Sequence, residues 1–138
     1  MSRAEPLSPL ELLGVWRLER RIADRLAGAS GRMTGTLSLT ETADGAVAWA
    51  ERGVLWWAGR EFESTRELLI RRDGAGWLVC FADGRPFHPW RPGRPVTHPC
   101  RADVYRGLVD AAPRRLRVVW DVTGPAKDQR LLTRCSRC

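Results

Sequence analysis

The residue types best suited to chemistry lie close together in residues 81–105. This stretch contains both histidines, His88 and His98, followed by a carboxylate at Asp103 and the chain's single tyrosine, Tyr105. An imidazole can exchange a proton near neutral pH, a carboxylate can orient it, and a phenol can donate a hydrogen bond. The set could therefore bind a polar ligand or carry out acid–base catalysis.

A catalytic reading assigns one role to each of three residues. His98 would be the general base, Asp103 would orient it, and Tyr105 would stabilise a developing oxyanion, which suits an isomerase, cyclase or hydrolase acting beside a carbonyl. No recognisable motif pairs a nucleophile with a base, so catalysis stands as an alternative to ligand binding. A second alternative is a protein-interaction module whose contact surface is the segment rich in proline, arginine and tryptophan at 86–95.

The same stretch contains side chains that could bind a metal ion. The side chains of the zinc-binding type are His88, His98, Cys100 and Asp103. The spacing of His98 and Cys100 is not a metal signature, and no histidine follows His98 to serve as a late axial haem ligand. We therefore predict no metal and no cofactor. Cys135 and Cys138 have CxxC spacing without a helix start that would activate a thiol, and the sequence assigns them no role.

The elements that must position these residues are expected to be short strands. Apolar and polar residues alternate with a period of two, most clearly at 32–41, where Met33, Leu37 and Leu39 share one face. Similar segments occupy 14–22, 46–57, 60–72, 77–82, 100–108, 114–123 and 129–137, with turns between them. A short helical turn is expected at 9–13, after Ser8 as its N-cap. The pattern predicts an all-β fold, an antiparallel up-and-down barrel of about 8–10 strands, because closure removes exposed sheet edges.

The segment between the two histidines is expected to interrupt this pattern. The tight turn Asp83-Gly84-Arg85-Pro86 should end a strand near Ala82. Residues 86–95 carry too many prolines for a helix or a central strand and are predicted to form an ordered loop. An extended segment should then run from Cys100 to Leu108, with Asp103 and Tyr105 on one face and Cys100, Ala102 and Val104 on the other.

Length and hydropathy predict one domain. The chain has 138 residues, 43% of them hydrophobic, enough for a single core over residues 1–138, with 1–9 as a loose lead-in. No run approaches the roughly 18 apolar residues of a membrane span, and the N-terminus lacks a secretory pattern. We expect a cytoplasmic protein without a membrane partner.

The positive net charge of the chain is weak evidence for a nucleic-acid partner. The formal net charge is +7, but Lys127 is the only lysine among 23 basic residues. So strong a preference for arginine, with many alanines and glycines, indicates a GC-rich bacterial genome. The arginines are scattered, without a block of five or six, and we therefore predict no nucleic-acid partner.

Several motifs resemble those of a known family. Gly14-Val15-Trp16 is similar to the Gly-x-Trp signature on the first strand of lipocalin-like barrels, which often place an arginine of the last strand, here Arg134, against that tryptophan. A longer pattern comprises Phe81-x-Asp83-Gly84-Arg85-x-Phe87-His88, His98-x-Cys100-x-x-Asp103-x-Tyr105-x-Gly107, Trp120-x-Val122-x-Gly124-Pro125-x-Lys127-Asp128 and Thr133-Arg134. It resembles, over nearly the whole chain, the uncharacterised family known as domain of unknown function 6314. The resemblance implies a calycin-like barrel and no established activity, and Cys135 stands where an aromatic residue is expected.

Together these observations predict a small-molecule-binding barrel. Its ligand would be a partly apolar, anionic organic molecule held in the cavity, with Trp16, Trp49 and Trp120 as flat apolar walls. The expected ligand contacts are Trp16, His88, His98, Asp103, Tyr105, Trp120, Lys127 and Arg134. The identity of the ligand and the oligomeric state, a homodimer included, are not determined by the sequence.

Overall fold

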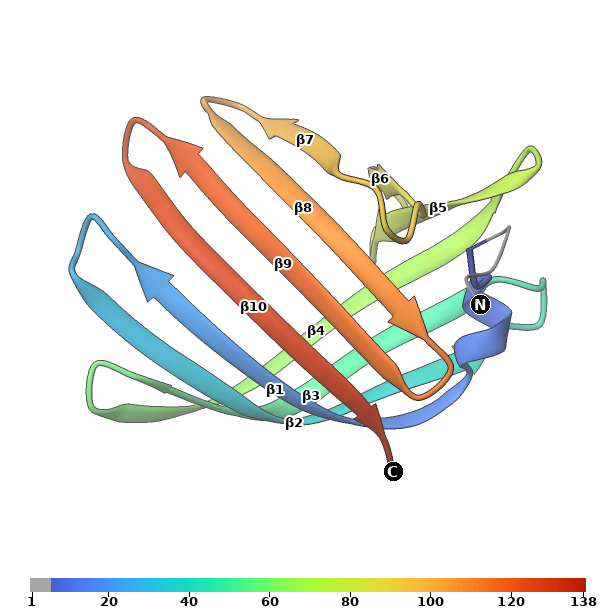
Figure 1. Ribbon diagram of the computed structural model, residues 1–138, viewed down its shortest axis with the longest axis horizontal. Helices are drawn as coiled ribbons and strands as arrows, with labels where there is room; N and C mark the ends of the chain where they lie inside the picture. Colours follow the sequence, from blue (N-terminus) through green and yellow to red (C-terminus); the bar gives the residue numbers. More distant parts are fainter. Residues whose placement is uncertain (1–5) are drawn as a thin grey trace.

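The chain forms one antiparallel sheet of ten strands that curls into a nearly closed barrel (Figure 1). This architecture comes from a computed structural model, which describes residues 6–138. The strands are β1 (Gly14–Asp24), β2 (Ala29–Glu41), β3 (Val47–Trp57), β4 (Arg60–Asp73), β5 (Gly76–Phe81), β6 (Pro86–Pro89), β7 (Val96–Cys100), β8 (Asp103–Ala112), β9 (Arg115–Gly124) and β10 (Lys127–Arg137). The predicted all-β barrel is confirmed.

The sheet joins the two ends of the chain. Its order is β6-β5-β4-β3-β2-β1-β10-β9-β8-β7, so the first strand pairs with the last as well as with the second. The two edges of the sheet are the short strands β6 and β7. Within residues 6–138 no backbone ladder joins these edges. The segment 90–94 and the stacked rings of Phe87 and Trp120 bridge them instead.

Period-two alternation determines which side chains fill the barrel. Along β1 the side chains of Trp16, Leu18 and Arg20 are buried, while their neighbours in sequence are exposed. The same pattern on β2 buries Met33 and Leu37, as expected for a sheet with one wet face. The interior therefore receives alternate residues from every long strand, including an arginine.

A short 3-10 helix, η1 (Pro9–Leu12), covers one end of the barrel, which we call the closed end. The backbone N–H of Ser8 donates to the Glu11 carboxylate at 2.8 Å, which satisfies a free donor at the helix start. Leu12 is fully buried, and its carbonyl oxygen accepts a hydrogen bond from the Trp16 indole at 2.9 Å. The predicted helical turn is thus confirmed.

The N-terminal lead-in can be followed in part. Leu7 and Pro9 are buried, and the Leu7 carbonyl accepts a hydrogen bond from the Trp90 indole at 2.9 Å. This part packs against the barrel instead of extending loosely from it. The rest of the lead-in, residues 1–5, lies outside the described residues.

Two details around the histidines differ from expectation. Residues 86–89, predicted as loop, form β6, an edge strand paired with β5, where proline is tolerated because one side of the strand is unpaired. The segment from Cys100 to Leu108 is not one strand. A turn at Arg101, with a φ of 57°, separates β7 from β8, so His98 faces Tyr105 across a hairpin. The turn lacks the usual glycine or asparagine, which is why sequence inspection missed it.

No helix within residues 6–138 is long and apolar enough to cross a membrane. The predicted cytoplasmic location stays a prediction.

The close approach of β2 and β3 leads to a first test. Gly35 pairs with Gly53, and a Cβ on Gly35 would collide with the backbone of Arg52 and Gly53. We expect Gly35→Ala to lower the free energy of unfolding by about 1–3 kcal/mol, because backbone atoms cannot move aside. Gly76→Ala is the control, since its new methyl group would meet only an ordinary contact at 3.8 Å. Equal denaturant midpoints for the two variants would contradict this account.

Candidate functional site

A charged network lies inside the barrel where hydrophobic side chains would be expected. Glu51 on β3 is 2% exposed, and Arg20 on β1 donates to both of its carboxylate oxygens at 2.9 Å. The Arg66 guanidinium donates to the same carboxylate at 3.1 Å and the Trp49 indole at 2.9 Å. Arg20 also donates to the Thr133 hydroxyl at 2.7 Å. Three charged groups thus share one interior site.

The network keeps Glu51 ionised. Burial by itself disfavours the charged carboxylate, but the charges of Arg66 and Arg20 and hydrogen bonds from Trp49 and Arg20 hold its pKa below the usual value. With two guanidinium groups and one carboxylate, the cluster carries a net charge of about +1 in the interior, because arginine stays protonated. A surplus positive charge of this kind favours the approach of an anion.

Arg66 lies where the inner face of β4 changes from exposed to buried. Along this face Phe62 is 43% exposed, whereas Leu68 is 8% exposed. The Arg66 side chain, between them, is 38% exposed. Its Nε is buried and has no hydrogen-bond partner within the described residues. Arg66 therefore holds Glu51 with one nitrogen and retains donor capacity for another group.

The end of the barrel opposite η1 is less well covered, and we call it the open end. Inward-facing side chains near the hairpins at this end are only half-buried. They are Ile22, Leu55, Trp57, Ser64, His98, Tyr105, Gln129 and Leu131. At the closed end, by contrast, Leu12 and Trp16 are fully buried. The open end therefore has a half-buried rim of mixed apolar and polar side chains, and the charged network is more deeply buried.

A cluster of aromatic rings lies inside the barrel where the two edges of the sheet approach each other. Phe87 on β6 stacks on Phe81 and on Trp120, with ring centres 4.6 and 4.9 Å apart. His88 and His98 approach the Phe87 ring edge-on at 4.8 and 5.1 Å. Tyr105 lies 6.1 Å from the His98 ring. The structure therefore brings together four of the predicted residues: His88, His98, Tyr105 and Trp120.

His88 is held as a neutral imidazole. Its burial lowers its pKa, and the nearby charges of His98 and Arg66 lower it further, against the opposing effect of a hydrogen bond with Pro89. Because the Pro89 carbonyl can only accept, Nδ1 must carry the proton in this 2.8 Å contact. Nε2 is then the acceptor. His88 also lines a small cavity of about 20 Å³ together with Arg66, Trp49 and Trp120, which has room for roughly one water molecule.

Asp103 and Lys127 pair with each other at the rim. The Lys127 ammonium lies 3.3 Å from the Asp103 carboxylate, and this hydrogen bond, with the charges of Tyr105 and Asp103, raises the pKa of Lys127. Within the described residues no hydrogen bond or ion pair links Asp103 to His98. The contacts therefore do not form the base-and-orienter pair that the catalytic alternative requires.

The tryptophan of the first strand has a different partner from the one expected. Trp16 pairs in register with Arg137, whose guanidinium lies 4.4 Å above the indole ring. Arg137 also donates to the carbonyls of Leu13 and Glu11, so it fastens η1 to the barrel. Arg134 is exposed on the outer face, because odd- and even-numbered residues of β10 point to opposite sides. The expectation that Arg134 covers Trp16 is wrong.

The cysteines occupy separate environments. Cys135 faces inward and is buried, and burial together with the charge of Glu51 raises its pKa to about 12, while Cys138 is exposed. Cys135 therefore stays a protonated thiol at neutral pH. Within residues 6–138 no group of three or more His, Cys, Asp or Glu side chains is arranged to hold a metal ion.

Sequence reasoning missed Arg20, Glu51 and Arg66 as a unit. The only signal in the sequence is a charged residue at an inward position of each of three otherwise alternating strands. The register that sets Glu51 beside Arg66 is tertiary information.

The fold and site define a calycin-like antiparallel β-barrel with a charged interior. The chain belongs to the family of unknown function DUF6314, whose model matches residues 12–137. No curated protein matches the sequence.

Two solved structures are similar in fold. The S-type phycobiliprotein lyase CPES from Guillardia theta has a TM-score of 0.64 at 11% identity, with 94% of this chain and 90% of that chain covered. The protein EF1p2_mFAP2b, solved bound to DFHBI, has a TM-score of 0.51 at 10% identity, with 95% of this chain and 97% of that chain covered. Identities this low establish the barrel fold alone.

The buried carboxylate leads to a second test. We expect Glu51→Gln to lower the free energy of unfolding by about 3–5 kcal/mol at neutral pH, because it leaves the buried guanidinium of Arg20 and the partly exposed one of Arg66 without a counter-charge. The pKa of Glu51 is depressed in the folded state, so the difference between wild type and variant should be present above about pH 4.3 and vanish as the pH falls through the lower folded value. Urea unfolding measured across pH checks this. A difference independent of pH would refute the charge-based explanation.

The state of His88 leads to a third test by ¹⁵N NMR. At pH 7 the ring should show a protonated Nδ1 and an unprotonated Nε2, and it should titrate below the usual histidine value of about 6.5. Since the unfolded chain then binds the proton more readily, this residue should reduce stability as the pH falls below that value. His88→Gln should abolish that contribution. A ring that is charged at pH 6.5 would contradict the assignment.

Proposed function

We propose that this protein binds a partly apolar organic anion at the open end of its barrel. The observation that carries the proposal is the Arg20–Glu51–Arg66 cluster, in which two guanidinium groups share one carboxylate inside the barrel. Arg66 is the only one of the three that is substantially accessible, with 38% of its side chain exposed. It would contact the anionic group of the ligand.

Charge balance supports an anion over a neutral or cationic ligand. Glu51 already accepts hydrogen bonds from Arg20, Trp49 and Arg66, so its oxygens are engaged. The Arg66 Nε, by contrast, is a buried donor without an acceptor among residues 6–138, and an unsatisfied buried donor costs about 1–3 kcal/mol. A carboxylate or similar oxyanion that contacts the exposed part of the Arg66 guanidinium would balance the surplus charge.

The neighbouring surface favours an apolar body on the same ligand. From Arg66 toward the rim, the inner face of the barrel presents half-buried Leu55, Trp57 and Ile22. The aromatic cluster with His98 and Tyr105 borders the other side, where two rings offer polar edges beside an apolar surface. The internal cavity of about 20 Å³ is too small for an organic molecule, so the ligand would lie at the mouth with its head group directed inward.

The structural comparisons are compatible with this role. A barrel of the same fold was solved bound to DFHBI, and the other is a phycobiliprotein lyase by name. Of the residues expected from sequence, the proposal retains His88, His98, Tyr105 and Trp120, with Lys127 and Asp103 at the rim. It does not include Trp16 or Arg134, because the first is fully buried at the closed end and the second is on the outer face.

The test compares two ligands that differ only in charge. Isothermal titration calorimetry would measure the affinities for 1-naphthoate and for its neutral isostere 1-naphthamide. The wild-type protein should bind the carboxylate about 10–100-fold more tightly, because a hydrogen bond to a charged group contributes a free energy of this size. Arg66→Gln should remove this preference while leaving the affinity for the amide unchanged.

Arg71→Gln is the matched control, since Arg71 lies on the same strand but is exposed on the outer face. It should bind both compounds as the wild type does. Near-ultraviolet circular dichroism verifies that each variant is folded. Equal affinity of the wild type for acid and amide, or no binding of either, would rule out the proposed anion site.

A further inference from the structure

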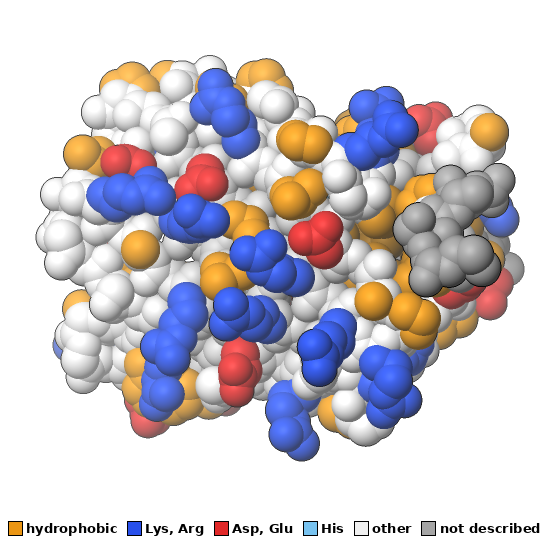
Figure 2. All heavy atoms as spheres, in the orientation of Figure 1, with side chains coloured by type: hydrophobic (Ala, Val, Ile, Leu, Met, Phe, Trp, Pro, Cys, Tyr) orange, Lys and Arg blue, Asp and Glu red, His pale blue; other side chains and the backbone are white. Residues whose placement is uncertain are grey.

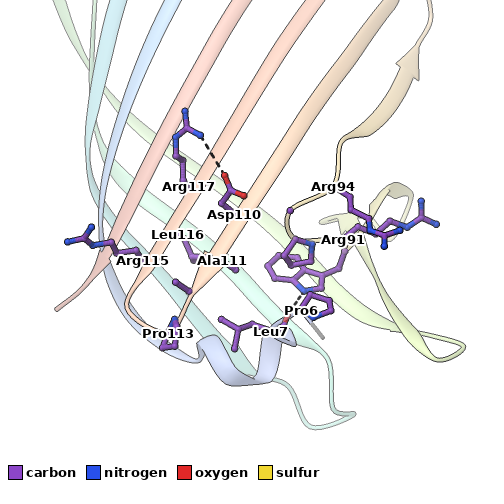
Figure 3. Close-up of a pocket in the computed structure, with 14 residues that line it drawn as sticks. Pro6, Leu7, Arg91, Arg94, Asp110, Ala111, Pro113, Arg115, Leu116 and Arg117 are labelled. Atoms are coloured by element: carbon purple, nitrogen blue, oxygen red, sulfur yellow. Dashed lines mark hydrogen bonds and ion pairs between the residues drawn. The ribbon is translucent and has the colours of Figure 1, made fainter. Parts of the chain in front are cut away.

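A groove of about 780 Å³ lies on the surface where the barrel wall is incomplete (Figure 3). We call it the seam groove, because it runs between segment 90–94 and the end of the β8–β9 hairpin. Its lining includes Leu7, Trp90, Leu116, Asp110, Ala111 and four arginines. It is separate from the interior site at the open end, and the proposed function makes no use of it.

The seam groove combines an apolar base with a basic rim. Leu7, Trp90 and Leu116 are buried beneath it, whereas its four arginines are exposed. Asp110, the single acidic residue among the described residues that line the groove, lies 3.6 Å from Arg117. Of the ion pairs formed within residues 6–138, this is the only one in the groove, so the positive charge of Arg91, Arg94 and Arg115 is not balanced locally.

The groove also exposes an edge of the sheet. The ladder between β7 and β8 ends where Val96 pairs with Gly107. Two residues farther along β8, the Val109 carbonyl accepts a hydrogen bond from the Gly93 N–H at 2.7 Å. Backbone groups two residues apart on a strand point to the same side, so the N–H and C=O of Ala111 face the groove. Within the described residues neither group has a backbone partner there.

We propose that the seam groove binds an extended acidic peptide segment of a partner protein, which adds as a short strand along the edge of β8. The open N–H and C=O of Ala111 would pair with the peptide backbone, as in β-strand addition. Alternate side chains of the peptide would then face the apolar base and the arginines of the rim. The peptide side chains that face the arginines should be acidic, because opposite charges then lie next to each other.

The same features disfavour a nucleic acid. Binding of single strands relies on aromatic faces that stack with bases. Trp90 is the only aromatic residue in the groove lining; it is 8% exposed, and its indole N–H is bonded to the Leu7 carbonyl. Charge by itself does not single out this groove, because arginines are spread over the whole face formed by β8, β9, β10 and β1 (Figure 2). The feature that distinguishes the groove is the free edge of β8 at Ala111.

The test uses the full chain and a fluorescein-labelled peptide of alternating glutamate and valine, followed by fluorescence anisotropy. We expect saturable binding that weakens with salt. The double variant Arg91→Glu with Arg94→Glu should weaken binding at least about tenfold, since it reverses two charges at the rim. The control Arg71→Glu reverses an exposed charge outside the groove and should change the affinity less than about threefold.

A second peptide tests the strand edge without altering the protein. N-methylation of alternate residues on the side facing β8 removes the backbone donors and should weaken binding about tenfold, while a lysine–valine peptide should not bind. Several results would overturn the proposal: no saturation at millimolar peptide, equal loss in Arg71→Glu, or equal affinity for the N-methylated peptide.

Other occupants would be recognised by their own results, each of which overturns the proposal. Tighter binding of oligothymidylate than of the peptide would assign the groove to nucleic acid. A tenfold gain in peptide affinity on deletion of residues 1–5 would assign it to the chain's own N-terminal segment. Dissociation of a dimer by the peptide, seen in sedimentation, would assign it to a second copy. None of these measurements depends on naphthoate binding, so the two proposals fail independently.

Discussion

Closure of the sheet between its two short edge strands is the constraint on which the rest of the structure depends. β6 and β7 do not form a ladder with each other within the described residues, so the wall must be completed by other means. The Trp90 N–H donates to the Trp77 carbonyl on β5, and the Gly93 N–H donates to Val109 on β8. Stacking of Phe87 on Trp120 joins the same two sides from within. A proline-rich segment can do this because it need not supply a continuous series of donors.

The candidate site follows from this closure. Phe87 brings His88 from β6 and His98 from β7 to one cluster, although the two residues belong to opposite edges of the sheet. The charged network reaches the cluster from the other wall through Arg66, which lines the same small cavity as His88. A buried ion pair is seldom a net source of stability relative to apolar packing. In the proposed function, the network serves instead by the charge that it presents to a ligand.

The incomplete wall also accounts for the seam groove. A longer β7 would have paired with all of β8 and covered its outer edge, but β7 contributes pairs only as far as Val96. Exposed strand edges promote unwanted association, and proteins commonly protect them with charge. Here the arginines around the edge restrict what can pair with it. One gap in the barrel wall thus accounts both for the position of the aromatic cluster and for a surface suited to an acidic strand.

The sequence by itself determined the fold class and part of the site. Alternation along residues 32–41 and the other strands is a local property, so it predicted the barrel and its inward faces. Ser8, as an N-cap, predicted the short helical turn that follows it. The types and positions of residues in the sequence also directed attention to His88, His98, Tyr105 and Trp120. Only the tertiary structure decided that Arg137, rather than Arg134, covers Trp16, that Asp103 pairs with Lys127, and that Arg20, Glu51 and Arg66 share one site. These outcomes depend on strand register and barrel curvature, which arise from pairing between segments far apart in the chain and leave no local periodic signal.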